Sequence, residues 1–383
     1  MRRRASTTSS TTCTTDGSRA GSSRSDPVAR SGTPSATGSP SRSVHAPIRS
    51  PVLPLPRYPV HREDRGRHDG DPLDRRGRVV RRPAPAGNWG RWGAEDERGA
   101  LNLIEPEGVR TAAHEVRTGR TYSLALPIAR GNQPAFDFRG SPQRLTLVSQ
   151  TDAMYDGFEG GGDVGSNEDV LIIPSHNLTH MDALCHVQAK GRFYNGFPAD
   201  TFRSHTGAGR CGIDKLGAFA TRAVLLDLPR HFDTPYLEGG YRITAADLAG
   251  CAERQGVEVR SGDALLVRTG YLDEYRAIEA SGREPSFAQP GLSLDAVDYV
   301  RAREISVVGA DNSAIECIPF DDRFLSVHIA LLVESGVPLL EHLWLTDLAE
   351  GMAQAGTYSC LLCVSPLPVT GATGSPINPV AIV

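Results

Sequence analysis

Three histidines and one aspartate lie within eleven residues near the middle of the chain, at His176, His180, Asp182 and His186. Imidazole nitrogen and carboxylate oxygen are ligands that zinc and manganese accept, and three of them leave one coordination position open. A divalent cation with an open position lowers the pKa of bound water, which favours hydrolytic chemistry. Hydrogen-bonded core or surface histidines are the alternative, but that is the usual role of one histidine rather than of three beside an aspartate.

The spacing of the four side chains favours an extended backbone. In a helix, His176 and His180 would share a face while Asp182 would point roughly 200° further round, whereas alternate residues of a strand face the same side. Residues 170–173 are apolar and stop before a proline, which predicts a buried strand leading into the cluster. His186, the last of the four, is the side chain that we expect to stay free of the metal as a general acid or base.

The pattern His-x-x-Thr-His-x-Asp-x-x-x-His resembles the signature of the cyclase family of metal-dependent hydrolases, which includes bacterial kynurenine formamidase and isatin hydrolase. Further segments that are similar to parts of this family are residues 88–104, 266–271, 328–332 with 336–343, and 366–376. With the motif they span about residues 88–380. The resemblance therefore covers all of the chain that we expect to fold.

The resemblance implies a role for each matching residue of the motif. His176, His180 and Asp182 would be the ligands of a first metal ion, and His186 would be the catalytic acid or base. It also implies zinc or manganese as the metal, and a swivelling β/β/α fold that assembles as a homodimer or homotetramer.

A second ligand segment is implied by the same resemblance. Where relatives hold two ions, Asp182 and Glu341 would bridge them and His328 would bind the second. From the residues alone, His328 is a core-edge histidine on a predicted helix at 323–335. Glu341 ends an apolar run, where a carboxylate is costly to bury unless a partner such as a metal is present. One or two ions are therefore expected.

The chain departs from the family pattern at Leu178 and Leu184, where relatives usually carry glycine and proline. Glycine readily adopts a positive φ, so with leucine at residue 178 the resemblance does not fix the loop path or the substrate pocket. The ligand types are intact. His342 stands where relatives often have a smaller polar residue, and we expect it at the surface rather than tuning the second site. Asp311 follows a predicted strand and is either a site residue or a turn residue.

Charge is distributed unevenly along the 383 residues. Residues 1–85 carry a net charge of +10 and residues 86–383 one of −14, and an acidic body argues against nucleic-acid binding. Residues 1–85 are rich in Ser, Thr, Arg, Gly and Pro, so we predict a disordered tail that cannot offset its ordering entropy. We interpret this tail as an unstructured extension, with a nucleic-acid or partner-binding arm as the alternative. No apolar run approaches the roughly 20 residues that a membrane span needs.

Seven cysteines are scattered along the chain, which is not the pattern of a disulfide framework. Since the first residues also lack the apolar stretch of a secretory signal, we expect a cytoplasmic protein. Cys360 and Cys363 have the spacing of a redox or zinc pair, but on a strand they would face opposite ways. Cys185 would lie opposite the metal ligands by the same alternation. Core packing is the expected role of all three.

Strands and helices alternate beyond the tail, which predicts one mixed α/β domain over residues 86–383. The predicted strands are 121–128, 144–149, 170–173, 222–228, 264–269, 305–310, 337–340 and 357–364. The predicted helices are 106–117, 244–255, 272–280, 294–303 and 323–335. Thr244 and Asp247 have the spacing of a capping box at the start of the second helix.

These features predict a metal-dependent hydrolase that cleaves an amide, formamide, lactam or cyclic ester bond of a small molecule by metal-activated water. A metal-dependent lyase or cyclase, and a non-catalytic ligand-binding protein, are the alternatives. A serine nucleophile is not indicated, because no Gly-x-Ser-x-Gly elbow occurs. Aromatic residues in predicted loops would either stack an aromatic substrate or pack the core: Phe136, Phe138, Phe193, Tyr194 and Phe197.

Overall fold

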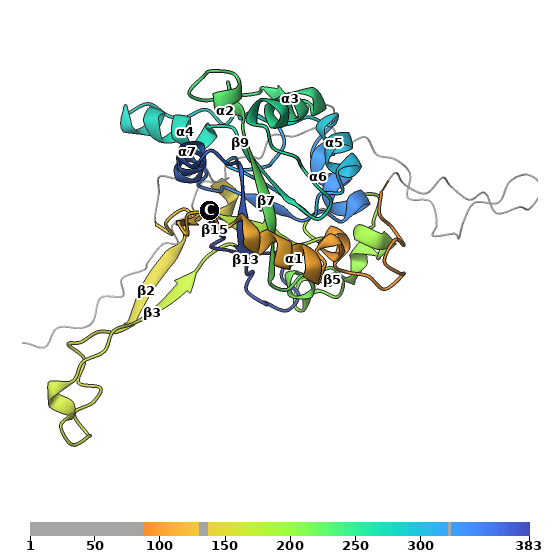
Figure 1. Cartoon of the computed structure of the whole chain (residues 1–383). Coiled ribbons are helices and arrows are strands. Elements are labelled where there is room, and N and C mark those ends of the chain that lie inside the picture. The colour runs from red at the N-terminus through yellow and green to blue at the C-terminus, as the bar shows by residue number, and fades with distance from the viewer. Residues whose placement is uncertain (1–86, 130–136, 321–322) are drawn as a thin grey trace, which may run out of the picture. The chain divides into compact units, whose positions relative to one another are not determined.

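The computed structural model describes residues 87–129, 137–320 and 323–383, so the predicted disordered tail lies outside the described residues. The described strands form a nine-stranded sheet and three two-stranded sheets (Figure 1). In spatial order, the large sheet consists of β1 (Thr121–Ser123), β15 (Val380–Ile382), β13 (Ser359–Val364), β7 (Phe219–Asp227), β9 (Ala264–Arg268), β11 (Val307–Ala310), β12 (Leu339–Glu341), β4 (His180–Asp182) and β14 (Gly374–Pro376). The small sheets pair β2 (Gln143–Val148) with β3 (Glu168–Ile172), β5 (Phe202–Arg203) with β6 (Gly207–Ala208), and β8 (Arg242–Ile243) with β10 (Gly291–Leu292).

The middle of the large sheet is parallel, with β7, β9, β11 and β12 as successive neighbours. These strands are almost wholly buried, as expected of parallel strands that are covered on both faces. The outer strands β1, β15 and β13 on one side, and β4 and β14 on the other, pair antiparallel. The mixed α/β class predicted from the sequence is therefore confirmed.

The helices connect these strands or flank them. They are α1 (Pro106–Ala112), α2 (Leu228–His231), α3 (Ala245–Gln255), α4 (Tyr271–Ala280), α5 (Ala296–Ala302), α6 (Ser326–His328), α7 (Thr346–Ala355), a π-helical turn η8 (Ile329–Ser335), and the short 3-10 helices η1 (Gly99–Leu103), η2 (Ala113–Glu115), η3 (Asp137–Arg139), η4 (Gly161–Asp163), η5 (Tyr194–Gly196), η6 (Ala199–Thr201) and η7 (Ile213–Lys215). Within the described ranges, no helix combines the length and the apolar composition that crossing a membrane requires.

Each predicted strand and helix has a counterpart in the structure, with ends shifted by a few residues. The capping box at Thr244 and Asp247 is present, with both reciprocal hydrogen bonds. Helix α7 was not predicted, because no side chain caps its start and it contains Gly351. A Cβ at Gly351 would lie only 1.9 Å from the Tyr122 hydroxyl, so this glycine serves the packing of α7 against β1 rather than the helix itself.

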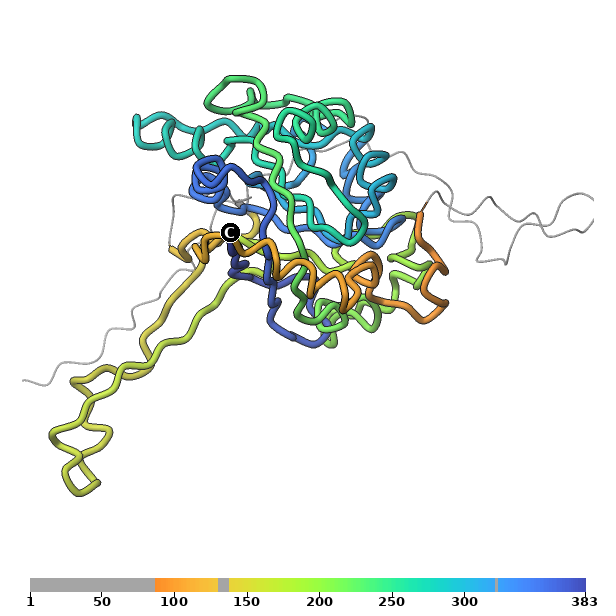
Figure 2. The backbone as a smooth tube through the Cα atoms, in the orientation of Figure 1, coloured from red at the N-terminus to blue at the C-terminus, as the bar shows by residue number. Residues whose placement is uncertain are grey.

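The strand that precedes the histidine cluster is not buried, which corrects the sequence-based prediction. β3 exists, but it pairs only with β2, and the two strands form a ribbon that extends away from the large sheet (Figures 1 and 2). Val170, Leu171 and Ile172 are 37%, 54% and 53% exposed. An apolar run predicts a strand that some surface covers, but it does not say whether that surface lies in the same chain.

Candidate metal centre

Strand pairing brings the two predicted ligand segments together. Glu341 on β12 lies directly opposite His180 on β4, and Asp182 lies opposite Gly374 on β14. A Cβ at Gly374 would lie 2.6 Å from Cε1 of His176. The absence of a side chain at residue 374 therefore leaves room for the His176 ring beside β4.

The cluster is extended only over β4, and the backbone turns sharply before it. Leu178 has φ of 58°, which lies in the left-handed region that glycine adopts most easily. Its side chain is buried, with 2% of its surface exposed. The turn brings His176 back alongside His180 and Asp182, which corrects the prediction that one extended chain aligns all four side chains.

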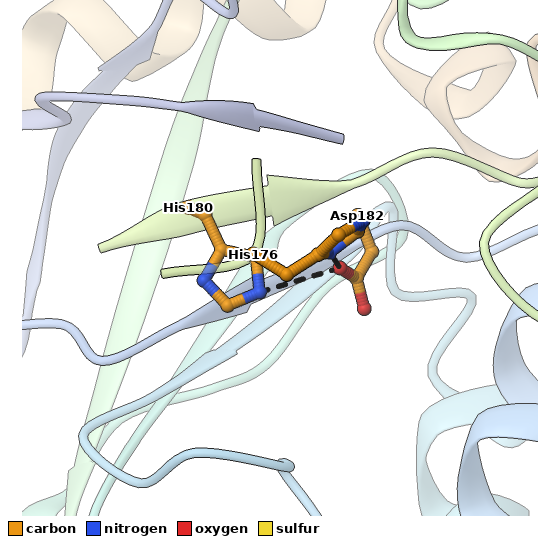
Figure 3. Close-up of side chains that lie close together, drawn as sticks. All are labelled: His176, His180 and Asp182. Carbon is orange, nitrogen blue, oxygen red and sulfur yellow. Dashed lines mark hydrogen bonds and ion pairs between the residues drawn. The ribbon is translucent and has the colours of Figure 1, made fainter. Parts of the chain in front are cut away.

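His176, His180 and Asp182 converge with their ligand atoms all within 4.8 Å of one another (Figure 3). Nδ1 of His176 lies 2.7 Å from Oδ1 of Asp182, and Nε2 of His180 lies 3.4 Å from the same oxygen. Nδ1 of His180 donates a hydrogen bond to the carbonyl oxygen of Leu178, at 2.7 Å. In the neutral imidazole this leaves the lone pair on Nε2, the atom that faces Asp182.

A second group contains Asp182, His328 and Glu341, whose ligand atoms also all lie within 4.8 Å of one another. Nε2 of His328 lies 3.3 Å from Oε1 of Glu341 and 3.8 Å from Oδ2 of Asp182. The other oxygen of Glu341 lies 3.3 Å from Nε2 of His180. Asp182 therefore faces His176 and His180 as well as His328, and Glu341 faces His180 and His328.

His186, the predicted acid or base, lies against the first group. Its ring stacks on the ring of His176, with centroids 3.8 Å apart and planes 25° apart, and its centroid lies 6.4 Å from that of His328. Burial lowers the pKa of His186 to about 3 in the absence of a cation, against the opposing charge of Asp182. The imidazole is therefore neutral at pH 7.

Three polar atoms of the two groups are buried without a hydrogen-bond partner among the described residues. Nε2 of His180, Oδ2 of Asp182 and Oε1 of Glu341 are all buried and have no hydrogen-bond partner within the described part of the chain. Buried polar atoms without partners are rare and costly, and an ion is one of the ordinary explanations. All three are atoms of the kinds that bind zinc or manganese in proteins, imidazole nitrogen and carboxylate oxygen. The residues present therefore fit a divalent cation.

The electrostatics of the centre agree with this fit. Burial alone would raise the pKa of Asp182 and Glu341, yet their histidine neighbours lower the pKa of Asp182 well below its ordinary value and that of Glu341 to about 2. Burial alone would likewise lower the pKa of His180, but Asp182 and Glu341 raise it to about 9. Two buried ionised carboxylates require positive charge, which protons supply when no metal is bound.

One residue of this region was missed by the sequence-based reasoning. Glu316 is buried, with 1% of its surface exposed, and its Oε1 lies 2.5 Å from Nδ1 of His328. Glu316 lies in the loop after β11, and no spacing rule in the sequence links it to His328. The only signal in the sequence is an acid inside an otherwise apolar stretch, Ala314 to Ile318.

His342 is buried rather than exposed, which corrects the surface position expected for it. One per cent of its surface is accessible, and its Nδ1 donates to the carbonyl oxygen of Leu178 at 3.1 Å. The same carbonyl therefore orients both His180 and His342. Burial lowers the pKa of His342 to about 4, so its ring is neutral as well.

The remaining candidates have structural roles. Asp311 accepts hydrogen bonds from the backbone of Thr269 and Gly270, which assigns it to a turn rather than to the metal groups. Cys185 and Cys360 are buried, and burial raises the pKa of each thiol to about 12. Cys363 is partly buried on the opposite face of β13 from Cys360. Cys185, Cys360 and Cys363 are free thiols.

Of the aromatic residues considered for substrate stacking, Phe193, Tyr194 and Phe197 are buried in the hydrophobic core. Phe138 is 79% exposed, and Phe136 lies outside the described residues. The core interpretation therefore holds for the first three.

Comparisons with known proteins agree with the fold and the motif. The model of the family described as "Putative cyclase" matches residues 122–317. A solved structure of a novel cyclase is 36% identical, with a TM-score of 0.71, over 78% of this chain and 99% of its own. Isatin hydrolase A from Ralstonia solanacearum is 19% identical, with a TM-score of 0.50, over 73% of this chain and 98% of its own. None of the curated proteins compared with the chain matches it. By the family match and the 36% identity, this chain is a member of the cyclase family.

Proposed function

We propose that this chain is a metal-dependent hydrolase that cleaves an amide, formamide, lactam or cyclic ester bond of a small molecule. The observation that carries the proposal is the set of buried ligand atoms on His180, Asp182 and Glu341 that have no hydrogen-bond partner in the described part of the chain. His176 and His328 complete the two groups, which makes zinc or manganese the expected metal and two ions the expected number.

Some of these residues would hold the metal, and His186 would move protons. A zinc or manganese ion held by these ligands supplies a water of lowered pKa and polarises a carbonyl group. His186 would accept a proton from water and return it to the leaving nitrogen or oxygen, and the stacking of its ring on the expected ligand His176 supports this role. Leu178 and Glu316 hold the rings of His180 and His328, so that neither ring turns during this proton transfer.

Metal content is the first test. Purified protein should contain about two equivalents of zinc or manganese by elemental analysis, and a chelator should remove activity that added metal restores. Protein that binds no metal and is indifferent to chelators would remove the basis of the proposal.

Product analysis then separates hydrolysis from the alternative, a metal-dependent lyase or cyclase. In heavy-oxygen water, only hydrolysis places solvent oxygen in a new carboxylate. A substrate screen at fixed metal should include N-formylkynurenine, isatin and simple lactones, with isatin included because a fold relative is named an isatin hydrolase. An aromatic small molecule is one of the substrate classes that this screen tests. Absence of turnover with metal bound would favour a non-catalytic ligand-binding protein.

We also propose that the protein acts as a homodimer or homotetramer. The ribbon of β2 and β3 supports this, since Leu145, Val170 and Ile172 form one apolar face of it and all three are exposed. An isolated two-stranded hairpin is marginally stable in water, so a second copy covering this face would stabilise it. Light scattering should give a mass of at least two chains, and the double variant Leu145→Glu with Ile172→Glu should give monomers.

We propose a cytoplasmic location because the chain has free cysteine thiols. The thiols of Cys185, Cys211, Cys251, Cys360 and Cys363 are free, and all but that of Cys363 are buried, which suits a reducing compartment. Fractionation of the source cells, with a known cytoplasmic enzyme as marker, tests this.

A further inference from the structure

The side-chain carboxylate of Glu316 makes four contacts, two to the expected metal ligand His328 and two to the residues just before it. Its Oε1 accepts from the backbone N–H of His328 at 3.1 Å and lies 2.5 Å from Nδ1 of the same residue. Its Oε2 accepts from the backbone N–H of Val327 at 3.2 Å and from the hydroxyl of Ser326 at 3.5 Å. One buried carboxylate therefore holds both the first turn of α6 and the imidazole at its end.

The contact to Nδ1 decides which nitrogen of His328 is available. A carboxylate accepts but does not donate, so Nδ1 carries the proton that lies between it and Glu316. In the neutral ring, the lone pair is then on Nε2, the atom that lies 3.3 Å from Glu341 and 3.8 Å from Asp182. Without Glu316 the ring would be free to rotate about χ2 and to take either tautomer.

The two metal groups are supported by different neighbours. The ring of His180 is fixed by the Leu178 carbonyl, and Nε2 of His176 lies 2.9 Å from the Thr373 hydroxyl. None of the hydrogen bonds of Glu316 within the described residues reaches His176, His180 or Asp182. A change at Glu316 should therefore act on the second group and spare the first.

We propose that Glu316 is the positioning residue of His328 and that binding of the second cation depends on it. This inference rests on the metal centre of the proposed function. A carboxylate behind a metal-bound histidine fixes the ring and makes its free nitrogen a stronger ligand, and its loss weakens metal binding by about 10- to 100-fold.

The test measures metal binding directly, so it does not depend on knowing the substrate. Wild type, Glu316→Gln and Glu316→Ala are equilibrated with zinc buffered by a competing chelator, and the metal-to-chain ratio is followed against free zinc. Glu316→Gln preserves the volume and one acceptor oxygen but not the charge. Asp263→Asn is the matched control, because Asp263 is also a buried carboxylate that accepts from a backbone N–H, that of Arg260, but it touches no metal ligand.

The expected result is selective. In Glu316→Gln the second equivalent should bind about 10- to 100-fold more weakly, and in Glu316→Ala more weakly still, while the first equivalent changes by less than about 2-fold. Asp263→Asn should bind both equivalents as wild type does. Cobalt substitution gives a second readout, since the visible absorption that appears with the second equivalent should shift to higher cobalt concentration in both Glu316 variants.

Three results would overturn the inference. They are unchanged binding of the second equivalent in Glu316→Gln and Glu316→Ala, equal weakening of both equivalents, and the same weakening in Asp263→Asn. Equal weakening would assign Glu316 a general structural role, and binding of the first equivalent reports that the variant is folded. Failure of the proposed function is distinguishable from all three, because wild-type protein would then bind no metal at all.

Discussion

Glu341 lies opposite His180 in the antiparallel pairing of β12 with β4, and its Oε2 is 3.3 Å from Nε2 of that histidine. The two ligand segments are far apart in the sequence, so the backbone hydrogen bonds of this pair set the distance between them. A one-residue slip of β12 would turn Glu341 to the other face of the sheet. Adjacent strands near one edge of the large sheet therefore set the positions of His180, Asp182 and Glu341.

The proton-transfer role of His186 predicts a separation of metal binding from turnover. His186→Ala should retain both metal equivalents and lose about 10²- to 10⁴-fold in kcat, because a general acid or base is removed while the ligands stay in place. His180→Ala and Asp182→Ala should lose metal as well. Elemental analysis and steady-state kinetics on the same preparations distinguish the two cases. Wild-type turnover by His186→Ala would show that its assigned role is wrong.

Gly374 predicts a steric effect on the first metal group. Gly374→Ala would place a methyl group 2.6 Å from Cε1 of His176 and 2.8 Å from the Met181 carbonyl oxygen, so the ring must move away from Asp182. We expect weaker binding of the first zinc equivalent, measured by competition with a chelator. Gly108→Ala is the control, since that site in α1 has open space around it and an ordinary φ, and it should bind zinc as wild type does.

Leu178 combines backbone strain with a buried side chain, and the two effects have opposite signs in Leu178→Gly. Relief of the left-handed conformation contributes about 1–2 kcal/mol, whereas loss of a buried leucine side chain costs about 2–5 kcal/mol. The variant should therefore be less stable by up to about 4 kcal/mol in urea unfolding. Leu184→Gly, also buried but without a positive φ, should cost more than Leu178→Gly. Equal costs would mean that the positive φ at Leu178 carries no strain.

Stability of the metal-free protein should fall at alkaline pH. Burial would lower the pKa of both histidines, but the carboxylates outweigh it and raise His180 to about 9 and His328 to about 10, from 6.5 in the unfolded chain. Since the folded values are the higher ones, this stabilisation is complete below pH 6.5 and is lost as pH rises through 9 to 10.

Bound metal takes the place of those protons, so the loaded protein should depend less on pH over the same range. Thermal unfolding at pH 6, 8 and 10, with chelator and with saturating zinc, checks this. The expected result is a Tm that falls with chelator and stays nearly constant with zinc, so that the gain from zinc grows from pH 6 to pH 10. A Tm of the chelator-treated protein that rises from pH 6 to pH 10 would contradict the assignment of protons to His180 and His328.

The sequence by itself determined the chemistry of the centre and most of the elements around it. The types and spacing of His176, His180, Asp182 and His186 indicated a metal before any fold was known, and the resemblance added His328 and Glu341. The central strands β7, β9 and β11 were predictable because each is a short apolar run between turns. Such signals are local, since they depend on neighbouring residues along one strand or helix.

Only the tertiary structure decided how these parts meet. The partnership of Glu341 with His180, the burial of His342 and the contact of Glu316 with His328 all join segments that no local pattern connects. The exposure of β3 was hidden for the same reason. Burial and hydrogen-bond partners depend on which distant surface covers a segment, and that is fixed by the packing of the whole chain rather than by the residues of the segment itself.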